Sequence, residues 1–143
     1  MLKCGDTFLA PITSSGTEHL WIIITDPDAD GKAVGVNITT QRTYSETTVI
    51  LNAGDHPFVA HPSVINYRDA RIIDVKAVYT AIRIKPRSFV CKSQESCSAD
   101  LLKKVQEGML KSTKAQKAIK LRCASEWEAQ QKSAAASAKI PEK

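Results

Sequence analysis

Residues 20–39, LWIIITDPDADGKAVGVNIT, decide the fold that the sequence predicts. The first six are a continuous apolar run of strand length, which is typical of a strand buried on both faces. The aspartates, proline and glycine of residues 26–31 are typical of a turn. Residues 32–39 follow as a second strand, so we expect the two segments to form a β-hairpin.

Further short strands are expected around this hairpin. Phe8 and Leu9 can begin an N-terminal strand, residues 47–51 predict a third strand and residues 71–75 a fourth. Residues 77–84 are apolar and contain β-branched side chains, which fits either a fifth strand or a short helix. Strands at this spacing predict a mainly β fold, either a small barrel or a sandwich.

The character of the sequence changes after residues 85–87. Ser98 stands where an N-cap is expected, with Asp100 in the first turn, and apolar residues then recur at helical spacing. Ser112 or Thr113 can cap a second helix. These changes predict a barrel at residues 1–87, a linker at 88–98, a basic helical extension at 99–133 and a disordered tail at 134–143.

The net positive charge lies in the helical region. Residues 1–98 hold ten Lys or Arg and ten Asp or Glu, whereas residues 99–143 hold ten and five and so carry the whole net charge of +5. Such a block suggests an anionic partner, nucleic acid first and a membrane surface second, although it also fits a solvated helix face. A further interpretation is that the helices cover an apolar groove on the barrel or dock on a partner chain, since Leu101, Val105 and Met109 are suitably spaced.

Length and composition limit the class of protein. The chain has 143 residues, the usual size of one domain, or of one small domain with an appendage. No stretch approaches the roughly 20 apolar residues that cross a bilayer, and the N-terminus lacks the long apolar run of a secretory signal, so we expect a cytoplasmic protein without membrane contact. The four cysteines form no CxxC pair, which favours reduced thiols, and we expect no metal and no cofactor.

The stretch at residues 54–69, GDHPFVAHPSVINYRD, holds two of the three histidines. A proline follows both His56 and His61 and favours extended backbone, so a helical pair of metal ligands is not expected. Two histidines can act as general acid and base in RNA cleavage, where one takes the 2′-hydroxyl proton and the other protonates the leaving 5′-oxygen. The alternative is a turn held by proline and histidine hydrogen bonds.

Polar side chains next to the two hairpin strands are further candidates. Thr39 and Thr40 end the second strand, where their hydroxyls can bind a phosphate or simply cap a turn. His19 precedes the buried strand and is either a catalyst oriented by Glu18 or a structural hydrogen-bonding group.

Arginine, lysine and tyrosine supply the candidate nucleic-acid contacts. Arginine pairs with phosphate through a fork of donors, and tyrosine can stack on a base. Tyr67 could equally cover a barrel end, and Arg68 could pair with Asp69. The candidate contacts are Arg42, Tyr67, Arg68, Arg71, Lys103, Lys104, Lys111, Lys114, Lys117 and Lys120.

Several short motifs occur in a recognisable order along roughly residues 3–80. They are Gly5-Asp6, the apolar run at residues 20–25, Val36-Asn37-Ile38-Thr39-Thr40, and Ser63-Val64 before Arg71-Ile72-Ile73. This order resembles the PemK/MazF-like toxins of bacterial toxin–antitoxin systems.

The resemblance implies an SH3-like β-barrel that cleaves single-stranded RNA without a metal, with Thr39 or Thr40 at the scissile phosphate. An antitoxin protein and a second copy of the chain are further candidate partners. Family members usually carry a catalytic arginine and a proline just before the buried strand, where this chain has His19-Leu20-Trp21. The loop at residues 54–61 and the basic C-terminal helices are additional.

The leading hypothesis is a toxin-like, metal-independent endoribonuclease that acts on single-stranded RNA. Its candidate catalytic residues are His19, Thr39, Thr40, His56 and His61. The rival is a non-catalytic module that binds a protein or a nucleic acid, which the missing Arg-Pro favours, because a shared fold does not imply shared chemistry.

Overall fold

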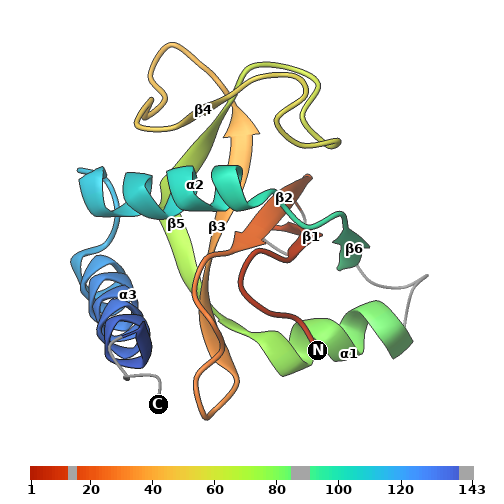
Figure 1. Ribbon diagram of the computed structural model, residues 1–143. Helices are drawn as coiled ribbons and strands as arrows, with labels where there is room; N and C mark the ends of the chain where they lie inside the picture. Colours follow the sequence, from red (N-terminus) through yellow and green to blue (C-terminus); the bar gives the residue numbers. More distant parts are fainter. Residues whose placement is uncertain (13–15, 85–90, 139–143) are drawn as a thin grey trace.

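The computed structural model describes residues 1–12, 16–84 and 91–138, which form one antiparallel six-stranded sheet, curled into a half-barrel, and three helices (Figure 1). The strand order in the sheet is β4-β5-β3-β2-β1-β6. The strands are β1 (Thr7–Pro11), β2 (Glu18–Ile23), β3 (Lys32–Thr40), β4 (Ile50–Leu51), β5 (Ser63–Asp74) and β6 (Lys92–Gln94). The helices are α1 (Val75–Ile84), α2 (Ala99–Lys111) and α3 (Lys117–Ala138).

The predicted hairpin, β2 paired with β3, lies at the centre of the sheet and is confirmed. Successive side chains of a strand point to opposite faces. Leu20 and Ile22 therefore enter one apolar cluster, while Trp21 and Ile23 enter a second cluster on the other face. All four side chains are buried, which explains why the run is continuously apolar.

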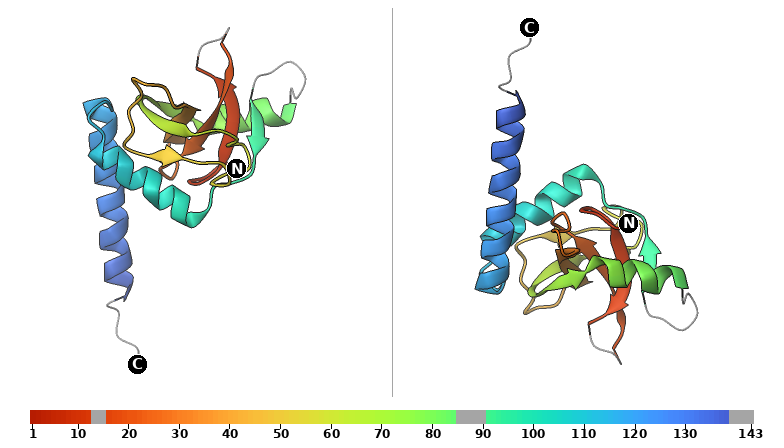
Figure 2. Two further views of the ribbon diagram at one scale, coloured as in Figure 1. Left: turned by 90° about the horizontal axis from the view of Figure 1, so that it is seen from above. Right: turned by 90° about the horizontal axis from the view of Figure 1, so that it is seen from below.

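The helices cover both faces of the sheet. Leu101, Val105 and Met109 of α2 complete the first cluster together with Ile119 of α3, so the interpretation of the helices as a cover for an apolar groove is confirmed. Helix α1 packs on the second cluster. The C-terminal half of α3 projects beyond the sheet (Figure 2). Within the described residues, no helix has the length and apolar character needed to cross a membrane.

A large irregularity in β5 shapes the side of the sheet next to α2. Gly35 of β3 pairs with Arg71, but Asn37 pairs with Asn66, so residues 67–70 of β5 stand opposite one residue of β3. Such a bulge bends its strand and re-aims its side chains. Here it directs Tyr67 into the core and Arg68 out to solvent.

Tyr67 joins the bulge to α2. Its ring is fully buried, and its hydroxyl donates a 2.7 Å hydrogen bond to the carbonyl oxygen of Val105. The contact requires a glycine in the next turn of the helix, because a Cβ on Gly108 would collide with Tyr67 Oη and with Val49 Cγ2. Burial raises the pKa of Tyr67 and the charge of Glu46 adds to the effect, so the hydroxyl stays a donor at neutral pH.

Several predicted boundaries differ from those of the structure. Strand β5 begins at Ser63, whereas the prediction began it at residue 71. The first half was missed because the bulge and its polar residues obscure the strand pattern there. The predicted linker contains β6, a short polar edge strand that pairs with β1. Residues 77–84 belong to helix α1, so of the two structures that the sequence allowed for this segment the helix is confirmed. Helix α3 continues past residue 133 to Ala138, and the remainder of the predicted tail lies outside the described residues.

We expect Gly108→Ala to lower the free energy of unfolding by about 1–3 kcal/mol, the usual cost of overpacking a core. The collision should outweigh the gain of about 1 kcal/mol in helix propensity. Urea denaturation measures the change. Tyr67→Phe removes one of the two colliding groups, so the double variant should lose less stability than the sum of the single variants. Strict additivity, or a Gly108→Ala variant as stable as the wild type, would contradict this packing.

Candidate nucleic-acid interface

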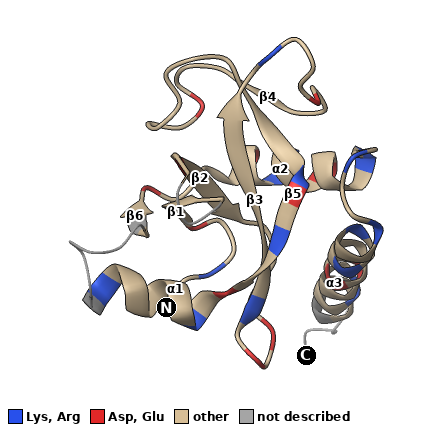
Figure 3. Ribbon diagram, turned by 180° about the vertical axis from the view of Figure 1, so that it is seen from behind, with Lys and Arg blue, Asp and Glu red and all other residues tan. Residues whose placement is uncertain are grey.

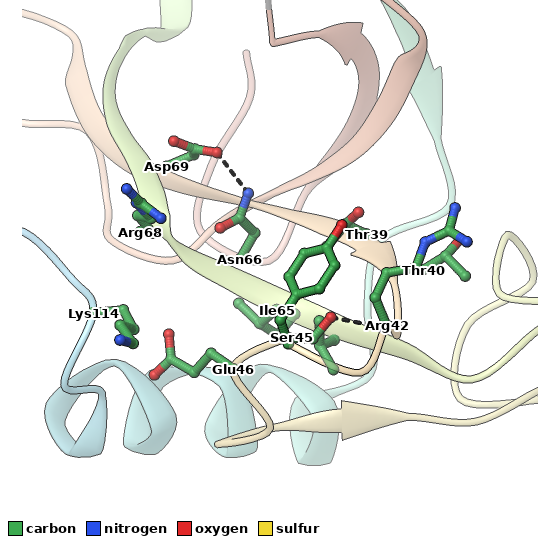
Figure 4. Close-up of a pocket in the computed structure, with 12 residues that line it drawn as sticks. Thr39, Thr40, Arg42, Ser45, Glu46, Ile65, Asn66, Arg68, Asp69 and Lys114 are labelled. Atoms are coloured by element: carbon green, nitrogen blue, oxygen red, sulfur yellow. Dashed lines mark hydrogen bonds between the residues drawn. The ribbon is translucent and has the colours of Figure 1, made fainter.

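A pocket of about 320 Å³ opens where the end of β3, the loop that follows it, the β5 bulge and the α2–α3 turn meet (Figure 4). We call it the bulge pocket. Its lining residues are Thr39, Thr40, Arg42, Tyr44, Ser45, Glu46, Val64, Ile65, Asn66, Arg68, Asp69 and Lys114. The pocket thus brings together five of the candidate residues from distant parts of the sequence: Thr39, Thr40, Arg42, Arg68 and Lys114.

The loop after β3 forms a tight turn at one wall of the bulge pocket. The backbone N–H of Arg42 donates to Ser45 Oγ at 2.8 Å, and the N–H of Ser45 donates back to the carbonyl oxygen of Arg42 at 3.1 Å. Both central side chains are consequently exposed, and Tyr44 is 89% accessible to solvent. An aromatic ring this exposed offers a face for stacking.

Glu46 ties this loop to the turn between α2 and α3. Its Oε2 atom accepts hydrogen bonds from Ser112 Oγ at 2.6 Å and from Thr48 Oγ1 at 2.8 Å. Ser112 Oγ in turn accepts from the backbone N–H groups of Lys114 and Ala115, both at 3.1 Å. The carboxylate therefore fixes the loop and the base of Lys114 with respect to each other.

Asn66 and Asp69 line another wall of the pocket, and Asn66 links them to the buried Asn37 behind it. Asn66 Nδ2 donates to Asp69 Oδ2 at 2.7 Å and to Asn37 Oδ1 at 3.4 Å. Asn37 is fully buried beneath them, and its Nδ2 atom has no hydrogen-bond partner among the described residues. A buried polar group without a hydrogen-bond partner lowers stability, and proteins keep such groups chiefly at functional sites, so Asn37 supports a functional role for the pocket.

The cations of the bulge pocket are available to a ligand. Among the described residues, no ion pair involves Arg42, Arg68 or Lys114. They stand on three separate elements around the pocket, and Figure 4 shows Arg68 and Lys114 toward one end and Arg42 toward the other. Glu46 and Asp69 also line the pocket, so its lining keeps a formal excess of positive charge that favours an anionic ligand.

The three histidines are not brought to one place. His61 is exposed and lines a neighbouring hollow that shares Thr40, Arg42 and Tyr44 with the bulge pocket. His19 lies on β2, its Nδ1 atom 3.2 Å from the carbonyl oxygen of Ile38, and does not line the bulge pocket.

His56 has a structural role, as its alternative interpretation expected. It is 3% exposed, its Nε2 atom lies 2.6 Å from the carbonyl oxygen of Glu95, and its Nδ1 atom accepts from the N–H of Phe58 at 3.0 Å. Thr7 Oγ1 donates to the same carbonyl oxygen at 2.6 Å. His56 thereby holds its own turn against the segment before α2, and both ring nitrogens are engaged.

The structure places two of the predicted nucleic-acid contacts, Tyr67 and Arg71, away from the bulge pocket. Tyr67 is buried under α2 and has no face open to a base. Arg71 lies on the other face of the sheet, 5.7 Å from the Trp21 ring centroid, and donates to the carbonyl oxygen of Ile12 at 2.7 Å. The exposed aromatic ring at the site is Tyr44, which the sequence signals only by its place in a polar loop.

The remaining candidate lysines are spread over the helices, as the charge distribution in Figure 3 shows. Lys103, Lys111 and Lys117 are exposed and lie outside the bulge pocket. Lys104 donates to the carbonyl oxygen of Ile50 at 3.2 Å, and Lys120 donates to that of Ser112 at 2.7 Å. The last contact satisfies a carbonyl group at the end of α2, a common use of lysine.

The cysteines are free thiols, of which Cys123 is buried and Cys4 half-buried. Burial raises the pKa of both to about 12, so they stay protonated at neutral pH and are poor nucleophiles. In residues 1–12, 16–84 and 91–138, no group of three or more His, Cys, Asp or Glu side chains is placed to hold a metal ion.

Comparison with models of known protein families, and with curated proteins, finds no match for this chain. The resemblance to the PemK/MazF-like toxins therefore rests on the short sequence motifs alone.

The hydrogen bonds of His56 fix its tautomer, because Nδ1 must accept from Phe58 and Nε2 must then carry the proton donated to Glu95. We expect ¹⁵N chemical shifts to identify the Nε2–H form at neutral pH. His56→Ala should lower the free energy of unfolding by about 1–3 kcal/mol, since it leaves buried polar groups unpaired. His61→Ala is the matched control at an exposed site and should change stability by less than about 0.5 kcal/mol. Equal effects would refute the structural role.

Proposed function

We propose that this chain binds single-stranded RNA in the bulge pocket. The observation that carries the proposal is the meeting of Arg42, Arg68 and Lys114 around the exposed ring of Tyr44. Cations that follow a phosphate backbone, combined with an aromatic ring on which bases stack, are the usual means of binding single strands.

The shape of the pocket favours a single strand over a duplex. A volume of about 320 Å³ is at the small end of ligand pockets and suits one nucleotide unit. A base must leave its stack and its pairing partner to lie on Tyr44, which unpaired RNA permits at low cost. The strand would then continue past Arg42 at one end and past Arg68 and Lys114 at the other.

The half-barrel and the strand-end threonines also suit the PemK/MazF-like relationship that the motifs imply. On that relationship the chain is a toxin-like RNA-binding protein, and an antitoxin protein is the natural inhibitor of such a surface. Binding, rather than cleavage, is the function that the geometry supports best, because His56 is buried in a structural role and His19 lies outside the pocket.

Metal-independent cleavage is the second candidate function, and one observation favours it. His61, Thr40 and Arg42 line a single hollow next to the bulge pocket. An RNA bound in the pocket could place a phosphate there, where the imidazole of His61 would accept the 2′-hydroxyl proton as the 2′-oxygen bonds to phosphorus. The bond from phosphorus to the 5′-oxygen would break, and the leaving oxygen would take its proton from solvent. Arg42 would stabilise the negative charge that develops on the phosphate.

The binding proposal is tested by fluorescence anisotropy with a short single-stranded RNA. Tyr44→Ala should weaken binding about 5- to 150-fold, since stacking contributes about 1–3 kcal/mol per base, whereas Tyr44→Phe should retain the affinity. The double variant Arg68→Gln/Lys114→Gln should reduce the slope of log K against log salt by about 1.4, or about 0.7 for each phosphate that the protein no longer neutralises.

The matched control is Lys103→Gln/Lys117→Gln, which removes the same charge from exposed positions outside the pocket. It should leave the salt slope nearly unchanged. An equal reduction in both double variants would mean that the RNA follows the general charge of the helices, and the pocket proposal would fail. Incubation of the same RNA with the protein in excess EDTA tests for cleavage. A 2′-deoxy substrate and the His61→Ala variant are the controls, and both should prevent cleavage if it uses the 2′-hydroxyl and His61.

A further inference from the structure

The Asn66–Asp69 wall of the bulge pocket has a fixed hydrogen-bond polarity. Asn66 Nδ2 has two protons, and both are used, one on Asp69 Oδ2 and one on Asn37 Oδ1. The orientation of the amide follows from chemistry, because an ionised carboxylate can only accept and so must face the Nδ2 side. What Asn66 has left to offer a ligand is its Oδ1 atom, an acceptor.

Asp69 presents a second acceptor beside it. Its Oδ2 atom is held by Asn66, which orients the carboxylate and leaves the Oδ1 atom to accept from a ligand. Asp69 is half-buried and therefore reachable from the pocket. A carboxylate with one oxygen anchored is a positioned acceptor rather than a mobile surface charge.

The other carboxylate of the pocket, Glu46, is not available in the same way. Its Oε2 atom already accepts from Ser112 and Thr48, and its Oε1 atom is shielded from solvent. Glu46 serves to position the loop. Asp69 is thus the carboxylate that a ligand in the bulge pocket would meet, and Figure 4 shows it with Asn66 on one wall.

We propose that the bulge pocket selects guanine in single-stranded RNA, with the Watson–Crick edge of the base on Asp69 and Asn66. This inference rests on the proposed RNA binding. Guanine presents two neighbouring donors, N1–H and the N2 amino group, which match adjacent acceptors. Adenine and cytosine each have an acceptor next to their amino group, and uracil has a single N–H between two carbonyl groups. Each of these bases can therefore donate only one hydrogen bond to the two acceptors of this wall, and its own acceptor atom would face the second one.

The surroundings fit a purine nucleotide in this orientation. Tyr44 offers its ring for stacking, and Arg68, next to Asp69 in sequence, is exposed at the bulge for a phosphate. The bulge turns this part of β5 out of the regular strand path. Arg68 and Asp69, although adjacent in sequence, can therefore contact the phosphate and the base of the same nucleotide.

The first arm of the test uses the wild-type protein and eight-nucleotide uridine RNAs that carry one central guanine, adenine, cytosine or inosine. The guanine RNA should bind about 5- to 150-fold more tightly than the adenine, cytosine and all-uridine RNAs, the discrimination expected of a paired hydrogen-bond contact. Inosine lacks the N2 amino group and should bind at least about fivefold more weakly than guanine.

The second arm uses Asp69→Asn, which keeps the shape of the side chain and replaces an acceptor with a donor. It should abolish the preference for guanine while the all-uridine RNA binds at least as well as before. Asp30→Asn changes the net charge equally at an exposed turn position, so it is the matched control and should keep the preference.

Equal binding of all RNAs by the wild type, or a preference that survives in Asp69→Asn, would overturn the guanine proposal alone. If no RNA binds, both the proposed RNA binding and the guanine proposal are overturned.

Discussion

The structure depends on the close approach of helix α2 to the bulge of β5. Tyr67 fills the space between them, its hydroxyl bonded to the Val105 carbonyl group, and Gly108 permits the contact. Because Tyr67 is anchored inward, Arg68 is forced outward, and the same bulge brings Asp69 to the rim of a pocket. One packing constraint therefore closes the apolar face of the sheet and also sets the directions of the side chains that form the candidate site.

Where the chemistry is local, the sequence predicts the structure well. The continuous apolar run at β2 indicates burial on both faces, and both apolar clusters contain it. Ser98 is an N-cap as predicted, accepting a hydrogen bond from the N–H of Leu101 at 3.1 Å. Strand β6 and the first half of β5 were not predicted, because their polar residues show no alternation typical of a strand. Both are strands because they pair with segments distant in sequence.

Only part of the candidate site was predictable, and only residue by residue, since Tyr44, Asn66 and Asp69 were not among the candidates. Thr39, Thr40, Arg42, Arg68 and Lys114 each carry a recognisable chemistry, yet nothing local distinguishes Lys114 from the other lysines of the helical region. The contact that selects it, between Glu46 and Ser112, joins residues 66 positions apart. The histidines show the converse: their clustering in sequence suggested catalysis, while in space His56 supports a turn and His61 alone lies beside the pocket.

The proposed function requires that the bulge pocket, and not the general charge of the helices, receives the RNA. The most direct measurement is a titration of the ¹⁵N-labelled protein with a short single-stranded RNA, followed by two-dimensional NMR. We expect the largest shifts in residues 39–46 and 66–69 and at Lys114. Shifts confined to the exposed lysines of α2 and α3, with the pocket signals unmoved, would contradict it.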